Sequence, residues 1–267
     1  MADSPGAAFF DLDKTIIATS STLAMGRSFY TRGMIGRRAV LKGAYARLVY
    51  HLGEVDAEKM DRMRDDLAKA VVGWEESTVR EVVEADLLDL INPLIYDEAA
   101  ALIESHHAAG RAVVIVSSSG DELVGPIGDL LGADEVVASR MVVEDGRYTG
   151  EVAFYAFGPY KAEAMRAMAA ERGWDLADCY AYTDSATDLP MLEAVGHPHA
   201  VNPDRSLRKA ATDRGWPILS FRHPVPLRER FGKLPAPSKP LTVGIAGAAV
   251  VAAAAGWRAR SHQRRAG

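Results

Sequence analysis

A short apolar stretch that runs directly into two carboxylates constrains this chain more than any other part of it. Residues 7–10 are Ala-Ala-Phe-Phe, and Asp11 and Asp13 follow with one leucine between them. Such a run predicts a buried parallel strand that surfaces at its carboxyl end, where open α/β sheets bind ligands. Two neighbouring carboxylates repel each other and lose solvation, which a hard cation such as Mg²⁺ commonly offsets. The alternative is an aspartate pair in a turn or a helix cap.

The second half of the chain alternates apolar runs with amphipathic segments. This alternation predicts a doubly wound parallel sheet, and therefore an α/β fold. Residues 141–148 are typical of a hairpin that turns at Asp145-Gly146. The expected strands are 111–116, 135–138, 179–182, 199–201 and 216–221, and the expected helices are 121–131, 158–172, 188–194 and 203–214.

Composition and charge narrow the function classes. The net charge of −5 argues against a general nucleic-acid binder. The single cysteine, Cys179, excludes an intrachain disulfide and suits a reducing compartment. The chain does not open with a basic segment followed by an apolar run, so we expect no secretory signal and a cytoplasmic catalytic domain.

The chain also divides into segments of different character. Apolar residues at three- and four-residue spacings between residues 21 and 107 predict a helical cap domain. This cap would be inserted into a catalytic core made of residues 1–20 and 108–222. Five prolines between residues 223 and 240 predict an extended linker.

The C-terminal segment, residues 241–267, suggests a tether. Residues 241–257 carry no charge, and arginines follow them. Seventeen helical residues would reach about 25 Å, slightly less than a hydrocarbon core of about 30 Å. We expect a membrane anchor here, with a surface-docked or disordered tail as the alternative. A basic stretch early in the cap favours either a solvated helix face or a helix that meets anionic lipid. Its basic residues are Arg27, Arg32, Arg37, Arg38, Lys42 and Arg47.

Four features that bear chemistry fall at comparable places on the expected sheet. They are the Asp11–Asp13 pair, Ser117 after the second strand, Lys161 at a helix start, and Asp184 with Asp188 after a third strand. A lysine at a helix start opposes the helix dipole, which an anionic partner would justify. Hydroxyl and N–H groups at 117–120 form a natural anion site. Each feature alone has a simpler alternative as a cap or a surface residue, but their convergence on one crevice favours phosphoryl chemistry.

These motifs resemble those of the haloacid dehalogenase (HAD) superfamily of phosphatases, in its phosphoserine-phosphatase-like branch. The resemblance covers about residues 7 to 222 and implies a Rossmann-like core with an inserted helical cap. The matching motifs, in family order, are Asp11-Leu12-Asp13-Lys14-Thr15, Ser117 after 113–116, Lys161, and Asp184-Ser185-Ala186-Thr187-Asp188.

The resemblance also implies a role for each residue. Asp11 would attack phosphorus and form an aspartyl-phosphate, and Asp13 would act as general acid and base. Mg²⁺ would be held by Asp11, Asp13 through its backbone carbonyl, and Asp184, with Asp188 supporting the site. The phosphoryl oxygens would be bound by Ser117, Ser118 and Lys161.

Some positions depart from the family pattern. In phosphoserine phosphatases, a glutamate nine residues past the nucleophile binds the amino group of the substrate. In this chain that position is Ser20. Thr183 and Thr187 replace a common Gly and Asn, which removes no carboxylate. Lys14 replaces a small residue, and it either adds positive charge at the edge of the pocket or points to solvent.

The expected function is that of a Mg²⁺-dependent phosphomonoesterase acting on a small phosphorylated metabolite. Alternatives with the same motifs are a phosphatase of a phosphorylated lipid or lipid precursor at the membrane, and a phosphotransferase. A phospho-accepting signalling receiver shares the acidic, hydroxyl and lysine groups, but it lacks a long helical block after the first strand. A membrane-tethered interaction protein with a vestigial pocket is disfavoured because Asp11, Ser117, Lys161 and Asp184 are intact.

Overall fold

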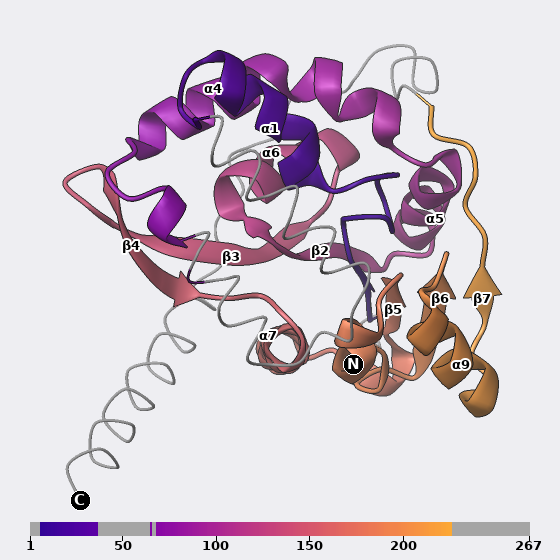
Figure 1. The fold of residues 1–267 in the computed structure, drawn as a ribbon. Helices are drawn as coiled ribbons and strands as arrows, with labels where there is room; N and C mark the ends of the chain where they lie inside the picture. Colours follow the sequence, from indigo (N-terminus) through magenta and orange to yellow (C-terminus); the bar gives the residue numbers. More distant parts are fainter. Residues whose placement is uncertain (1–5, 37–64, 66–67, 226–267) are drawn as a thin grey trace, which may run out of the picture.

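A seven-stranded sheet in the order β4-β3-β2-β1-β5-β6-β7 forms the centre of the fold. In this computed structural model, residues 6–36, 65 and 68–225 are described, and the others are drawn as a thin grey trace (Figure 1). β3 and β4 pair antiparallel, while the other neighbouring strands pair parallel. The expected α/β fold with a sheet of mainly parallel strands is confirmed.

The apolar opening stretch forms the central strand of this sheet. β1 (Ala7–Phe10) is fully buried and pairs in parallel with β2 (Ala112–Gly120) and β5 (Tyr180–Thr183). Successive side chains of β1 point to opposite faces, so Phe10 joins one apolar cluster and Phe9 joins the other. Helices cover both faces, and the strand delivers Asp11 to the carboxyl edge of the sheet (Figure 1).

One expected boundary differs from the structure on the β3–β4 side of the sheet. The sequence indicated a short strand at 135–138 and a separate hairpin, but β3 (Glu135–Glu144) is continuous and turns directly into β4 (Arg147–Phe154). The turn at Asp145-Gly146 is confirmed, and both residues have positive φ, 49° and 74°. β3 extends beyond the end of its pairing with β2. Its second half forms backbone hydrogen bonds with β4 instead, so the strand continues to Glu144.

The remaining core elements follow the expected order with adjusted ends. On one face lie α7 (Pro159–Arg172), α8 (Leu189–Leu192) and α9 (Arg205–Arg214), and on the other lies α6 (Asp121–Leu131). The sheet ends with β6 (His197–Val201) and β7 (Ile218–Leu219). The described residues also include three short 3₁₀ turns, which are η1 (Asn92–Leu94), η2 (Leu176–Asp178) and η3 (Ala186–Asp188).

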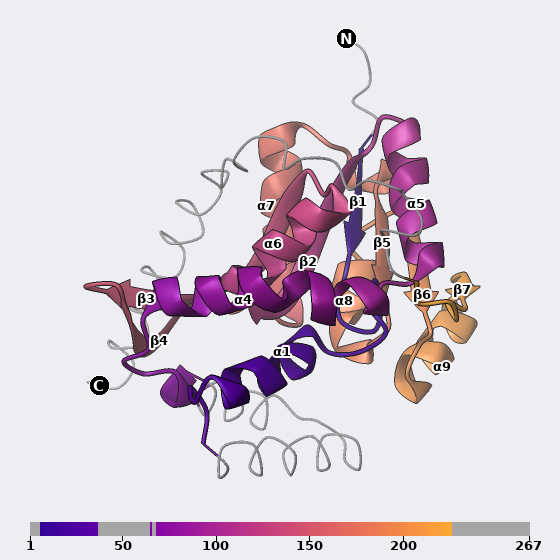
Figure 2. The ribbon, with the colours of Figure 1, turned by 90° about the horizontal axis from the view of Figure 1, so that it is seen from above.

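The segment expected to be a cap contains helices of two kinds. α1 (Ser21–Thr31) packs on α4 (Glu76–Leu90), and α4 packs on α6, to one side of the sheet (Figure 2). α5 (Asp97–Ala108) instead packs against β2, where its apolar side chains join the core cluster of Phe10. Residues 37–64 and 66–67 lie outside the described residues, so the division into core and cap stays a prediction.

The described chain ends beside the start of α5. The backbone N–H of Asp97 donates to His223 O at 2.8 Å, and that of Val225 donates to Ile95 O at 2.9 Å. Most of the expected linker and the whole expected anchor, residues 241–267, lie outside the described residues. Among the helices that the structure describes, none has both the length and the apolar character needed to cross a bilayer.

Candidate functional site

The site begins where β1 ends. The backbone N–H of Asp11 donates to Tyr182 O at 2.9 Å, which continues the pairing with β5 and aims the carboxylate past the edge of the sheet. The next turn closes through Ile16 N–H to Leu12 O at 2.9 Å and returns Thr15 to the pocket. The Thr15 hydroxyl donates to Asp11 Oδ2 at 3.4 Å. Asp11 is therefore buried, with 6% of its surface exposed, yet it is held by polar partners.

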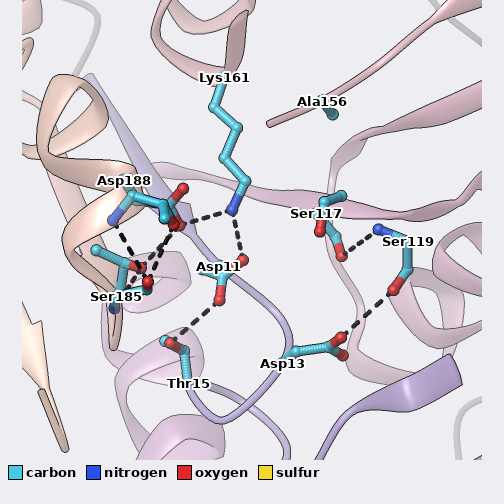
Figure 3. Close-up of polar contacts among 12 residues, drawn as sticks. Asp11, Asp13, Thr15, Ser117, Ser119, Ala156, Lys161, Ser185 and Asp188 are labelled. Atoms are coloured by element: carbon cyan, nitrogen blue, oxygen red, sulfur yellow. Dashed lines mark hydrogen bonds and ion pairs between the residues drawn. The ribbon is translucent and has the colours of Figure 1, made fainter. Parts of the chain in front are cut away.

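A buried lysine lies at the centre of the site (Figure 3). Lys161 enters from the first turn of α7, and its Nζ lies 2.6 Å from Asp11 Oδ1 and 2.7 Å from Asp188 Oδ2. Because its side chain is 3% exposed, this ammonium is not a solvated surface charge. The convergence of Asp11, Lys161 and Asp188 that we expected from the sequence is present in the structure.

The segment after β5 supplies the acidic wall. Asp188 Oδ2 accepts a hydrogen bond from the Thr183 hydroxyl at 2.9 Å, whereas Asp188 Oδ1 is buried without a hydrogen-bond partner. Asp184 is 9% exposed, and its Oδ2 lies 4.0 Å from Lys14 Nζ. Lys14 therefore adds positive charge at the edge of the pocket, which was one of its two alternatives. Thr183 acts as a hydrogen-bond donor to Asp188, a role that the sequence did not indicate.

Hydroxyl groups form the opposite wall. Ser117 is 1% exposed, and its Oγ accepts from the Ser119 N–H at 3.2 Å. The Ser119 hydroxyl donates to Asp13 Oδ2 at 3.4 Å, and the backbone N–H of Ser21 donates to Asp13 Oδ1 at 2.8 Å. Ser119 lies within the expected anion site at 117–120, but its contact with Asp13 was not predicted. β2 continues to Gly120, and its pairing with β3 is irregular between Ser117 and Gly120. Within this irregular stretch the Ser119 N–H bonds to Ser117 Oγ, which places Ser119 beside Ser117.

Ser118, expected beside Ser117 in phosphate binding, is placed differently. Its backbone carbonyl accepts a hydrogen bond from the Ser139 hydroxyl at 2.7 Å, which ties β2 to β3. The structure thus brings Ser119, and not Ser118, beside the Asp13 carboxylate, while the expected role of Ser118 stays a prediction.

Burial governs the electrostatics of these groups. Burial raises the pKa of Asp11 to about 7, although the neighbouring Lys161 ammonium opposes this rise. Burial, together with the Asp11 charge, raises the pKa of Asp184 to about 8. Burial also raises the pKa of Asp13. The pKa of Lys161 is raised despite its burial because two carboxylates surround it, so it stays charged. The pocket thus holds more carboxylates than its one buried ammonium neutralises, which favours a further cation.

The donor set fits Mg²⁺. Among the described residues, no three His, Cys, Asp or Glu side chains are grouped as a metal cluster. The set implied by the resemblance needs fewer side chains, because it combines Asp11 and Asp184 with the backbone carbonyl of Asp13. Mg²⁺ often uses one or two carboxylates together with water and substrate phosphate oxygens. The unpartnered buried oxygen of Asp188 and the raised pKa of Asp184 are consistent with a cation site at this wall.

Comparisons with known proteins agree with this geometry. The model of haloacid dehalogenase-like hydrolases matches residues 8–193. A Streptomyces azureus protein named as inhibiting morphological differentiation is 58% identical, over 97% of this chain and 94% of its own length. A Mycobacterium tuberculosis phosphoserine phosphatase is 33% identical, over 97% of this chain and 83% of its own. The apo crystal structure of a phosphoserine phosphatase shares the fold, with a TM-score of 0.56 and 21% identity, over 86% of this chain and 98% of that one.

The fold and the site together define a hydrolase built on a mainly parallel sheet, with the buried carboxylate of Asp11 at the carboxyl edge of that sheet. The chain belongs to the haloacid dehalogenase-like hydrolase family, in its phosphoserine-phosphatase-like branch, and it is an enzyme of the HAD phosphatase type.

Proposed function

We propose that this chain is a Mg²⁺-dependent phosphomonoesterase that hydrolyses a small phosphorylated metabolite through an aspartyl-phosphate on Asp11. The observation that carries the proposal is the buried Lys161 ammonium, 2.6 Å from Asp11 Oδ1 and 2.7 Å from Asp188 Oδ2. A buried cation in contact with a carboxylate allows that carboxylate to approach an anionic phosphate.

The residues divide the chemistry between the two walls of the site. A carboxylate oxygen of Asp11 attacks phosphorus, the bond from phosphorus to the ester oxygen breaks, and Asp13 gives its proton to that oxygen. Water then attacks phosphorus, Asp13 takes a proton from the water, and the bond from phosphorus to the Asp11 oxygen breaks. This step releases inorganic phosphate and restores the Asp11 carboxylate. Ser117 and Lys161 bind the phosphoryl oxygens. When bound, Mg²⁺ supplies charge neutralisation and polarises a phosphoryl oxygen.

The cap is the second part of the proposal. α1 and α4 would belong to a cap beside the carboxyl edge of the sheet, while α5 stays with the core. Ser20, the residue before α1, stands where phosphoserine phosphatases place the glutamate that reads the substrate amino group. This difference argues for a substrate other than phosphoserine, although a relative bears that name.

Hydrolysis of p-nitrophenyl phosphate tests the proposed reaction. We expect the purified protein to release nitrophenol when Mg²⁺ is present, and to lose at least about 100-fold in rate after treatment with EDTA, because the metal neutralises the charge of the phosphoryl group. Adding Mg²⁺ back restores the rate. Undiminished hydrolysis in EDTA, or none with Mg²⁺ in a folded sample, would contradict the proposal.

The stabilising effect of Mg²⁺ should depend on pH. Because folding raises the pKa of Asp11 to about 7 and that of Asp184 to about 8, the metal-free folded chain binds more protons than the unfolded chain. These groups therefore destabilise the metal-free fold as the pH rises from about 4 to about 8. Mg²⁺ binds the ionised carboxylates, so binding releases protons and strengthens as the pH rises.

Thermal melts with Mg²⁺ and with EDTA measure this effect. We expect the increase in Tm caused by Mg²⁺ to grow between about pH 5.5 and pH 8, and to shrink in Asp184→Asn. Exposed Asp129, on α6, offers the matched control Asp129→Asn, which should behave as the wild type. An increase in Tm that is independent of pH would show that these carboxylates do not hold the metal.

A further inference from the structure

Both carboxylate oxygens of Asp13 have partners that come from two different parts of the chain. Oδ1 accepts the backbone N–H of Ser21, in the first turn of α1, at 2.8 Å. Oδ2 accepts the hydroxyl of Ser119, near the end of β2, at 3.4 Å (Figure 3). Neither partner contacts Lys161, whose hydrogen bonds go to Asp11 and Asp188 on the other side of the site. The orientation of Asp13 is therefore held separately from that of the nucleophile candidate.

Ser119 is the centre of a small group of hydroxyls. Its Oγ lies 2.9 Å from Ser21 Oγ and 3.3 Å from Thr22 Oγ1. A hydroxyl offers one donor hydrogen and two acceptor lone pairs. With Asp13 ionised, Ser119 donates to Asp13 and accepts from the hydroxyls of Ser21 and Thr22. All three contacts of Ser119 are thereby satisfied in a buried position, where an unmade hydrogen bond would be costly.

The same group can also serve the protonated form of Asp13. Each oxygen of a carboxyl group has more than one lone pair, so Asp13 can carry its proton toward the leaving oxygen while it still accepts the Ser119 hydroxyl. The bond from Ser119 therefore keeps Asp13 in one orientation in both states. A general acid that later becomes a general base needs this, because its oxygen must face the ester oxygen first and the water second.

We propose that Ser119 is a positioning residue for Asp13, and that it joins this carboxyl group to the first turn of α1 through Ser21 and Thr22. This role rests on the proposed phosphatase function. The hydrogen bonds of the Ser119 hydroxyl go to Ser21, Thr22 and Asp13, and not to Asp11. It acts by holding Asp13 where the proton can reach the leaving oxygen, and it links that position to the placement of α1.

A series of phosphate esters with different leaving groups tests this role through kcat/KM. Nitrophenolate departs with little help from a proton, whereas the more basic oxygen of phenyl phosphate needs one. We expect Ser119→Ala to lower kcat/KM about tenfold for phenyl phosphate, and less than about twofold for p-nitrophenyl phosphate. Ser119→Thr keeps the hydroxyl and should restore the wild-type ratio. The control is Ser105→Ala, because exposed Ser105 lies near the C-terminal end of α5 and its hydroxyl donates to Leu102 O at 2.8 Å.

The outcomes separate the two proposals. Equal losses on both esters would show that Ser119 only supports the structure, and unchanged constants would show that Asp13 does not need it. Either result would overturn the positioning role and leave the phosphatase function standing. If Ser119→Ala does not fold, Ser119→Cys keeps a similar side chain with a weaker donor and should give the same selective loss. A folded wild type that hydrolyses neither ester with Mg²⁺ would overturn the proposed function and this role with it.

Discussion

Replacing Asp11 with Asn is expected to abolish phosphatase turnover, with a loss of roughly 10⁴-fold or more, while the fold is kept. A neutral amide oxygen is a poor nucleophile and forms no stable ester with phosphorus. The amide has nearly the shape of the carboxylate, and its oxygen can still accept the bond from Lys161 Nζ that Asp11 Oδ1 accepts at 2.6 Å. Burial of the Asp11 charge and its repulsion from Asp188 outweigh its attraction to Lys161, and Lys161 keeps Asp188 as a partner in the variant, so the metal-free variant should melt at the same temperature or higher.

Two measurements decide this prediction. Release of inorganic phosphate from p-nitrophenyl phosphate reports turnover. Acid quenching followed by mass spectrometry reports a phosphorylated chain, which we expect for the wild type and not for Asp11→Asn. Asp129→Asn changes an exposed carboxylate and should retain both properties. Mg²⁺-dependent turnover in Asp11→Asn at a comparable rate would mean that another group attacks phosphorus.

Replacing Lys161 with Met should damage both catalysis and stability. The change leaves Asp11 and Asp188 buried without the ammonium that now lies within 2.7 Å of each. Removing one partner of a buried ion pair costs about 3–5 kcal/mol in the free energy of unfolding. The loss of a preorganised charge at the phosphoryl group should lower kcat by roughly 10³-fold. Urea unfolding and nitrophenol release measure the two effects on the same sample.

A second substitution separates stability from chemistry. In Lys161→Met with Asp188→Asn, one of the two uncompensated charges is gone, so we expect part of the free energy of unfolding to return while activity stays lost. The matched control is Lys209→Met on α9, where the side chain is 78% exposed and pairs with Asp213, and the expected change is below about 0.5 kcal/mol. A Lys161→Met variant as stable as the wild type would show that the buried pair does not contribute to stability.

Much of the fold could be predicted because its signals are local. The fully buried strand at 7–10 and the left-handed turn at Asp145-Gly146 each follow from a few consecutive residues. The residue at which a strand ends could not be predicted in the same way, because it depends on which neighbouring strand supplies backbone hydrogen bonds. β3 continues to Glu144 because β4 pairs with it. β2 continues to Gly120 with irregular pairing after Ser117, and there the Ser119 hydroxyl bonds to Asp13.

The site was predictable as a set of residue types and less so as a set of contacts. The spacing of Asp11 and Asp13 at the end of an apolar run indicates a functional site. Lys161, 150 positions further along the chain, has the sequence signature of an ordinary exposed lysine, and only folding buries it against two carboxylates. Thr183 likewise has no local signal for its hydrogen bond to Asp188.

The sequence alone determined the alternation of strands and helices, the opening strand and the carboxylates at its end, because short-range patterns of apolar and polar residues set local structure. Only the tertiary structure decided which groups meet. The contacts of Lys161 with Asp11 and Asp188, and those of Ser119 with Asp13 and α1, join segments far apart in the chain. Their burial raises the pKa of Asp11 to about 7 and that of Asp184 to about 8, because desolvation depends on the packing of the whole molecule and not on neighbours in sequence.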